Sequence, residues 1–316
     1  MNQNLLKGIY CVAVLLCLTP YLNSASALVL GMALTLVFGN PYFNFFKKNT
    51  HRLLAYSVVG LGFGMNLGVV GKVGLQGFGY TVIGISFTTV LGLLLGKLLK
   101  TTPDSTVLIT VGTAICGGSA IAAVSPTIHA KQEDISVALA TVFLLNALAL
   151  VTFPLVGHAL SLSQSQFGLW CALAIHDTSS VVGASLQFGT EALQIATTVK
   201  LARALWIIPI ALITGFLYTK KNPSGEKAKA KRPWFILGFI LAAALVTAFP
   251  SLQPTGHVIE GFAKHLLVLT LFCIGASLTR ATLKAVGVKP LVLGVVLWVI
   301  VASASLAAIC AGFIHT

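Results

Sequence analysis

Residues 104–130 read DSTVLITVGTAICGGSAIAAVSPTIHA, an apolar run that stops at Gly117, Gly118 and Ser119 and then resumes with small residues. The apolar run of residues 164–190 also breaks and then continues. Its break consists of His176, Asp177, Thr178, Ser179 and Ser180. Adjacent glycines weaken a helix by about 1 kcal/mol each, and an Asp-Thr-Ser-Ser run supplies N-cap side chains that start a new helix. Both stretches are therefore predicted to be interrupted helices.

Composition places these interruptions inside a membrane. Of 316 residues, 57% are hydrophobic and 9% are charged, whereas an ordinary soluble domain has roughly 25% charged residues. The mean hydropathy is +0.95, so the apolar surface exceeds what one soluble core can bury and must face lipid. Irregular backbone at membrane depth is tolerated only where it is buried in protein or lines a watery cavity. Paired interruptions are typical of the binding site of a transporter.

Apolar segments recur along the whole chain, and roughly 20 helical residues cross the hydrocarbon core. We expect an all-α polytopic membrane protein of about nine to eleven transmembrane segments, in a single transporter domain over residues 1–316. Both interrupted helices lie in its N-terminal part, 1–218. A basic loop at 219–232 precedes the C-terminal helices at 233–316. The apolar runs are continuous rather than alternating, which excludes a β-barrel.

The formal net charge of +13, from 20 Lys and Arg against 7 Asp and Glu, is interpreted as a mark of topology. Basic residues collect in cytoplasmic loops, so this charge does not indicate a nucleic-acid partner. The clusters predicted to be cytoplasmic are Lys47, Lys48 and Arg52; Lys97 and Lys100; residues 219–232; and Arg280, Lys284 and Lys289. The N-terminus is then cytoplasmic and the C-terminus lies on the opposite side. The loop at 219–232 is expected to be solvated, with anionic lipid headgroups as an alternative partner.

The interrupted helices either cross the membrane or turn back as re-entrant hairpins. Hairpins place the charged loop at 129–134 inside and the uncharged loop at 158–166 outside, whereas crossing helices put Lys131 outside, which fits less well. Hairpins would also enter from opposite faces, as inverted repeats do. A short match between residues 64–67 and 275–278, GMNL and GASL, is a second sign of inversion. We therefore favour hairpins and an inverted repeat.

Lys200 and Arg203, within TTVKLARALWIIP, are the least expected residues. A charge at the centre of a spanning helix costs about 2.5–3.5 kcal/mol, so two of them need a reason. They share one helix face because they are three residues apart. The alternatives are a structural ion pair with Asp177 and a site for an anion, of which we favour the second.

The residues around the interruptions supply further candidates for binding an anion. Half-helices that begin near Gly117, Gly118 and Ser119, and near Thr178, Ser179 and Ser180, would direct N–H groups and a positive dipole end at it. Asp177 and His176 are the candidates for carrying a coupling proton, because His titrates near neutral pH and a buried carboxylate responds to nearby cations. The alternative is a helix cap beside a satisfied histidine. Asn146 is expected to form an interhelical hydrogen bond.

Enzyme and cofactor signatures are missing from the sequence, which has no HExxH, GxSxG or P-loop motif. The six cysteines show no metal spacing. No metal or cofactor is therefore expected, and transport would be driven by gradients. An anion channel, or an intramembrane enzyme that uses His176 and Asp177, remains the alternative.

Three motifs carry a family resemblance: GTAICGGSAIAAVSP at 112–126, AIHDTSSVVGAS at 174–185 and KLARALWIIP at 200–209. Together they resemble the YeiH-type family of bacterial inner-membrane proteins, which is named for sulfate export. The resemblance covers essentially the whole chain. It implies a bacterial inner-membrane protein that exports a small sulfur oxyanion such as sulfate or sulfite, with the C-terminus in the periplasm. The partners expected are that anion and the lipid bilayer, and a homo-oligomer is left open.

Overall fold

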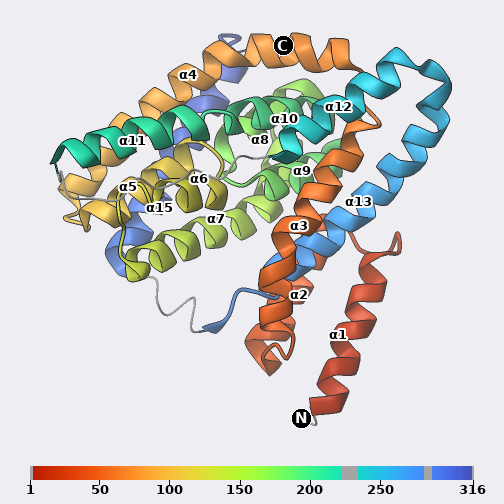
Figure 1. Cartoon of the computed structure of the whole chain (residues 1–316), viewed down its shortest axis with the longest axis horizontal. Coiled ribbons are helices and arrows are strands. Elements are labelled where there is room, and N and C mark those ends of the chain that lie inside the picture. The colour runs from red at the N-terminus through yellow and green to blue at the C-terminus, as the bar shows by residue number, and fades with distance from the viewer. Residues whose placement is uncertain (1–2, 222–233, 281–286, 315–316) are drawn as a thin grey trace.

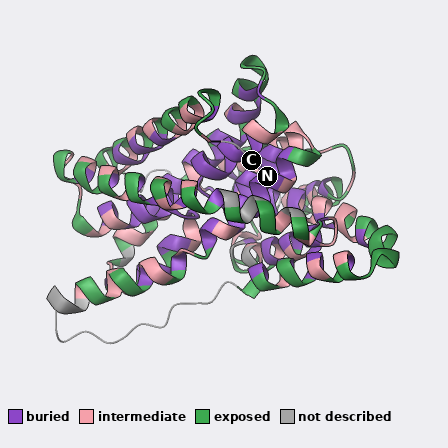
Figure 2. Cartoon of the chain, turned by 90° about the horizontal axis from the view of Figure 1, so that it is seen from above, coloured by how far each residue is buried: buried purple, intermediate pink, exposed green. Residues whose placement is uncertain are grey.

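The computed structural model describes residues 3–221, 234–280 and 287–314, and every regular element within them is a helix. Five apolar stretches in these residues are long enough to cross a membrane, judged by length and composition, and three shorter apolar helices accompany them. Large apolar side chains such as Leu75, Phe216 and Val258 are exposed, and Figure 2 shows the exposed residues on the outer faces of the helices. The predicted all-α polytopic membrane protein is thus confirmed. The predicted number of nine to eleven segments stays a prediction.

The helices form two bundles, which lie side by side in Figure 1. We call the first the outer bundle; it contains α1 (Gln3–Cys17), α2 (Ser24–Phe38), α3 (Phe43–Gly62), α12 (Trp234–Ala248), the 3-10 turn η1 (Pro250–Leu252) and α13 (Gln253–Gly275). We call the second the hairpin bundle; it contains α4 (Leu67–Leu98), α5 (Pro103–Ala114), α6 (Gly118–Val124), α7 (Gln132–Ala159), α8 (Gln164–Ala174), α9 (Thr178–Phe188), α10 (Thr190–Ala204), α11 (Ile207–Lys221) and α15 (Val288–Cys310). The chain therefore starts in the outer bundle, crosses to the hairpin bundle, returns, and ends in the hairpin bundle.

Glycines let the helices of the outer bundle cross at close range. A Cβ on Gly275 of α13 would lie 2.1 Å from the carbonyl oxygen of Leu28 in α2. A Cβ on Gly62 of α3 would lie 2.5 Å from the carbonyl oxygen of Phe239 in α12. Only a residue without a Cβ fits at these two places. The helix pairs α2–α13 and α3–α12 are therefore similar, because in each of them a glycine packs against a backbone carbonyl of the partner helix. The short sequence match aligned Gly64 with Gly275. In the structure, the residue of α3 whose contact is equivalent to that of Gly275 is Gly62.

The structure adds a third interruption that the sequence analysis did not predict. The apolar stretch that contains Lys200 and Arg203 is divided into α10, which ends at Ala204, and α11, which begins at Ile207. Pro209 lies in the first turn of α11, and its ring nitrogen has no N–H to donate to the carbonyl four residues earlier. The first three residues of the basic loop predicted at 219–232 belong to α11, which ends at Lys221. Its remainder lies outside the described residues, as does Lys284.

Candidate functional site

The first interrupted helix, α5–α6, turns back on itself. Asp134, at the start of α7, accepts hydrogen bonds from the hydroxyls of Thr102 and Ser105, at the start of α5, over 2.5 Å each. The backbone N–H of Lys131 donates to the Asp104 carboxylate over 3.4 Å. Because the two ends are held together, the chain leaves this segment where it entered. The hairpin alternative therefore describes α5–α6, and the crossing alternative does not.

The second interrupted helix, α8–α9, is a hairpin of the same kind. Gln164, at the start of α8, accepts hydrogen bonds from the backbone N–H groups of Glu191 and Ala192, over 3.0 and 3.4 Å. Phe167 of α8 stacks on Phe188 of α9 with ring centroids 3.8 Å apart. The 28 residues of α7 connect the two hairpins, a length of about 42 Å. The hairpins therefore open at opposite ends of α7.

The tips of the two hairpins touch. Gly117, which precedes α6, has a φ of +65° and a ψ of −127°, a combination that is favourable only for glycine. A Cβ there would lie 3.3 Å from backbone and side-chain atoms of Asp177, in the break between α8 and α9. The backbone N–H of Asp177 donates to the side-chain oxygen of Asn146 on α7 over 3.1 Å, as expected for an interhelical bond. Gly118 and Ser119 follow at the start of α6 and are half-buried.

Arg203 joins the broken ends of both hairpins. Its side chain is 1% exposed. Its Nε donates to the carbonyl oxygen of Ala114, the last residue of α5, and its Nη1 to that of Leu173 in the last turn of α8, each over 2.7 Å. Lys200 is fully buried and donates to the carbonyl oxygen of Ile175 over 2.7 Å. The two cations thus stabilise carbonyls that an interrupted helix leaves without intrahelical partners, at the negative ends of two helix dipoles.

These contacts give Lys200 and Arg203 a structural role that the sequence analysis did not predict. The partners expected from the sequence were a carboxylate or an anion, whereas the partners in the structure are backbone carbonyls. Arg203 Nη2 has no hydrogen-bond partner in the described residues, so the guanidinium retains donor capacity. Whether the two cations also bind an anion stays a prediction.

Asp177 is the N-cap of α9, as the Asp-Thr-Ser-Ser run predicted. Its carboxylate accepts hydrogen bonds from the backbone N–H of Ser179, over 3.1 Å, and from the Ser179 hydroxyl. The neighbouring His176 is fully buried, and its Nε2 lies 3.1 Å from the Thr113 hydroxyl. Thr178, Ser179 and Ser180 are buried in the first turn of α9. The role of Asp177 and His176 in proton coupling stays a prediction.

The two breaks correspond residue by residue at a separation of 60 positions, a pattern that the sequence analysis missed. Four such pairs are identical: Ala114 and Ala174, Ile115 and Ile175, Ser119 and Ser179, and Ser125 and Ser185. The backbone N–H groups of Ile115 and Ile175 each donate to the carbonyl four residues earlier over 3.0 Å. A self-comparison of the sequence at this separation would have revealed the pattern.

The helices after the hairpins correspond as well, at a separation of 57 positions. At this separation, Phe143 of α7 is equivalent to Lys200 of α10, and Asn146 of α7 is equivalent to Arg203 of α10. Phe143 packs beside Gly118 in its own hairpin, and Asn146 binds the break of the other one. Lys200 likewise binds its own hairpin, and Arg203 reaches the other one. Only one half of the site therefore carries charge on this helix.

Fold and site together define a polytopic helical membrane protein with two hairpins whose tips meet around buried cations. Comparison with known proteins gives the family. The family model described as Conserved hypothetical protein 698 matches residues 4–294. The UPF0324 membrane protein of Bdellovibrio bacteriovorus is 60% identical over 100% of this chain and 98% of its own length. That of Geobacter sulfurreducens is 49% identical over 98% and 97%, respectively.

The chain therefore belongs to the UPF0324 family of membrane proteins. This is the same family as the YeiH-type proteins, so the resemblance noted in the sequence is confirmed. No solved structure matches the chain.

Proposed function

We propose that the protein is a secondary transporter, not an enzyme, that exports a small oxyanion such as sulfate or sulfite by alternating access. The observation that carries this proposal is the pair of hairpins, which open at opposite ends of α7 and meet at Arg203. Non-helical backbone at membrane depth is typical of binding sites in transporters. Two buried cations at that place favour an anion as the ligand.

In this proposal, each predicted site residue has a role at the tips. Lys200 and Arg203 supply the positive charge, and Arg203 Nη2 still has hydrogens to donate. The ends of the half-helices, with Gly117, Gly118 and Ser119 on one side and Thr178, Ser179 and Ser180 on the other, supply N–H and hydroxyl donors. Asp177 and His176 carry the coupling proton.

An inverted repeat supports alternating access. We infer that α2 to α7 form one repeat and that α8 to α13 with α15 form the other, in permuted order. In the first repeat, α2, α3 and α4 precede the hairpin α5–α6 and α7. In the second repeat, the hairpin α8–α9 and the helix after it come first, and the counterparts of α2, α3 and α4 follow them in the chain. Three features favour this assignment: the separation of 60 positions between the breaks, the paired glycine contacts of the outer bundle, and the opposite openings of the hairpins. Such repeats allow one set of helices to adopt two mirrored arrangements.

The two hairpins differ in exposure, as one state of such a cycle would require. Gly118 and Ser119 are half-buried and Ala122 is exposed, whereas their counterparts Thr178, Ser179 and Val182 are buried. Hairpin α8–α9 packs on α2 and α13 of the outer bundle, whereas α6 packs on α5, α7 and α11. We infer that the site is reached from the α6 side in this state. The basic residues make that side cytoplasmic in the bacterial inner membrane, with the N-terminus inside and the C-terminus in the periplasm.

Flux through sealed liposomes tests the proposal. Purified protein is expected to move sulfate or sulfite, and a pH gradient is expected to accelerate that movement. Asp177→Asn is the informative variant, because asparagine caps a helix as well as aspartate does but carries no titratable charge. We expect Asp177→Asn to fold, to retain flux and to lose the response to the pH gradient. The measurement is initial uptake of radiolabelled anion with and without the gradient.

Three results would contradict the proposal. Absence of flux for sulfate, sulfite and organic sulfonates would exclude sulfur oxyanions as the substrates. Electrical conductance without coupling, unchanged in Asp177→Asn, would indicate an anion channel. Turnover of a lipid or peptide by detergent-solubilised protein, lost in His176→Ala, would indicate an intramembrane enzyme.

A disulfide between the two bundles tests their relative motion. A Cβ on Gly183 of α9 would lie 3.1 Å from the Cβ of Ser24 on α2, close to the spacing of bridged cysteines. In the Ser24→Cys/Gly183→Cys variant, we expect oxidation to reduce flux at least tenfold and reduction to restore it. The matched control is Gly92→Cys/Thr110→Cys, within the hairpin bundle, where the corresponding distance is 2.9 Å. Unchanged flux in a verified Ser24–Gly183 crosslink would exclude movement between the bundles.

A further inference from the structure

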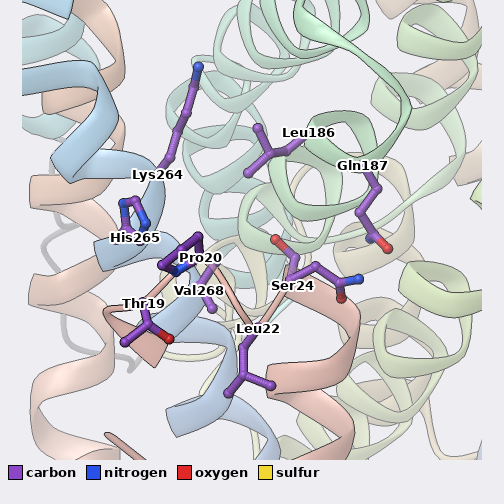
Figure 3. A pocket seen from close by; sticks show the side chains of 10 residues that line it. Thr19, Pro20, Leu22, Ser24, Leu186, Gln187, Lys264, His265 and Val268 are labelled. Carbon is purple, nitrogen blue, oxygen red and sulfur yellow. The ribbon is translucent and has the colours of Figure 1, made fainter. Parts of the chain in front are cut away.

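A cavity of about 220 Å³ lies between the two bundles, away from the hairpin tips. Its walls come from the turn between α1 and α2, from the last turn of α9 and from the middle of α13. Figure 3 shows Ser24 and Gln187 on one side of it and His265 and Lys264 on the other. A water molecule takes roughly 30 Å³ in the liquid, so the cavity can hold a small oxyanion together with some of its water.

Ser24 is the residue that points to a ligand. It is 1% exposed, and its hydroxyl is buried without a hydrogen-bond partner in the described residues. A buried hydroxyl left unpaired costs about 1–3 kcal/mol, which a ligand or water in the cavity would offset. Ser24 is also the first residue of the 15-residue helix α2. A capping box already pairs the N–H groups of Asn23 and Ser26. The N–H groups of Ser24 and Ala25 and the positive dipole end remain at this place, beside the Ser24 hydroxyl.

The opposite wall carries an ammonium group and an imidazole. Lys264 and His265 are adjacent on α13. Lys264 forms an ion pair with Glu260 over 2.8 Å, and Glu260 also lies 3.3 Å from His257. The ammonium needs only one of its three N–H groups for this ion pair, so two remain for a ligand. His265 Nδ1 donates to the carbonyl oxygen of Gly261 over 2.9 Å, so the Nε2 of the neutral imidazole is an acceptor. The donors that suit an anion are therefore Lys264 and the N–H groups at the start of α2.

We propose that this cavity, which we call the Ser24 cavity, is a second anion site, held by the Ser24 hydroxyl and the N-terminus of α2, with the Lys264 ammonium at its edge. It lies on the side of the outer bundle opposite the inferred cytoplasmic opening, because the α1–α2 turn and the end of α9 share that side with the end of α7. Gly183, which packs against Ser24 and Leu271, separates the cavity from the tips. If the proposed transport function is correct, this is where the oxyanion waits after release from the hairpins.

Thiol labelling in liposomes of phosphatidylcholine tests the site without depending on transport. The background carries Cys11→Ala and Cys310→Ala, because these two cysteines are exposed and the other four are buried. We expect Thr19→Cys, half-buried at the rim of the cavity, to react at least fivefold faster with an anionic methanethiosulfonate than with a cationic one of similar size. Millimolar sulfate is expected to slow that reaction, and Lys264→Gln, which removes the ammonium, is expected to abolish the preference. Ser251→Cys, exposed in the α12–α13 connection, should show neither effect.

Ser24→Cys, more deeply buried in the wall of the cavity, provides a second position should Thr19→Cys fold poorly. Equal rates for the two reagents, faster reaction of the cationic one, or absence of labelling at both positions would overturn the proposal. Protection by added phosphatidylglycerol but not by sulfate would also overturn it, since the ligand would then be a lipid headgroup. Loss of flux with intact sulfate protection would contradict the transport proposal and leave the Ser24 cavity as an anion site.

Discussion

Replacement of Arg203 by methionine is expected to destabilise the protein more than any other single change at the tips. The guanidinium donates to the carbonyl oxygens of Ala114 and Leu173, which belong to different hairpins. Methionine fills much of the same volume but donates nothing, so two buried carbonyls lose a charged donor. Each unsatisfied group costs about 1–3 kcal/mol, and we therefore expect a loss of about 2–4 kcal/mol in the free energy of unfolding. The measurement is thermal unfolding in detergent.

Arg203→Lys is the matched control. Lysine keeps the positive charge but presents a single ammonium instead of a planar fork, so it cannot bind both carbonyls in the same way. We expect its stability to lie between those of the wild type and Arg203→Met. Wild-type stability in Arg203→Met would mean that the two carbonyl contacts contribute nothing, and the structural role assigned to Arg203 would be wrong.

Replacement of Gly117 by alanine is expected to have the second largest effect. At a φ of +65° and a ψ of −127°, an alanine costs about 1–3 kcal/mol in backbone strain. Its Cβ would also press at 3.3 Å on the backbone of Asp177, where the other hairpin turns. Because both tips must shift together, we expect anion flux to fall at least tenfold while the protein remains folded. Flux per folded molecule, with folding checked by gel filtration, is the measurement.

The adjacent glycine provides the control for that experiment. A Cβ on Gly118 would meet two side chains, the edge of the Phe143 ring at 3.1 Å and Leu139 at 3.5 Å, and Gly118 is the first residue of α6. A side-chain ring can move aside more easily than a backbone, so Gly118→Ala is expected to retain most of the flux. If Gly117→Ala and Gly118→Ala behave alike, the left-handed conformation of Gly117 is not what holds the tips together.

The sequence predicted the two interrupted helices and the buried cations correctly, but it did not predict the contacts of these cations. The Gly-Gly pair and the Asp-Thr-Ser-Ser run interrupt helices through local effects, namely backbone freedom and side-chain capping, and local effects can be recognised in a linear sequence. The cost of charge in a membrane likewise singled out Lys200 and Arg203. Their partners are backbone carbonyls, which every residue has, so no residue type in the sequence could identify Ala114, Leu173 or Ile175 as acceptors.

Residue chemistry and apolar run length were enough to establish a helical membrane protein with two interrupted helices and two buried cations, because burial in lipid penalises every charge and every broken helix. Tertiary structure decided that the interrupted helices turn back, that their tips meet, and that Arg203 links them. Those outcomes depend on hydrogen bonds between residues that are far apart in the chain, such as Gln164 with Glu191, 27 positions apart, and Arg203 with Ala114, 89 positions apart. Such bonds form only once the helices have packed together, since the geometry that brings donor and acceptor within reach is absent from the extended chain.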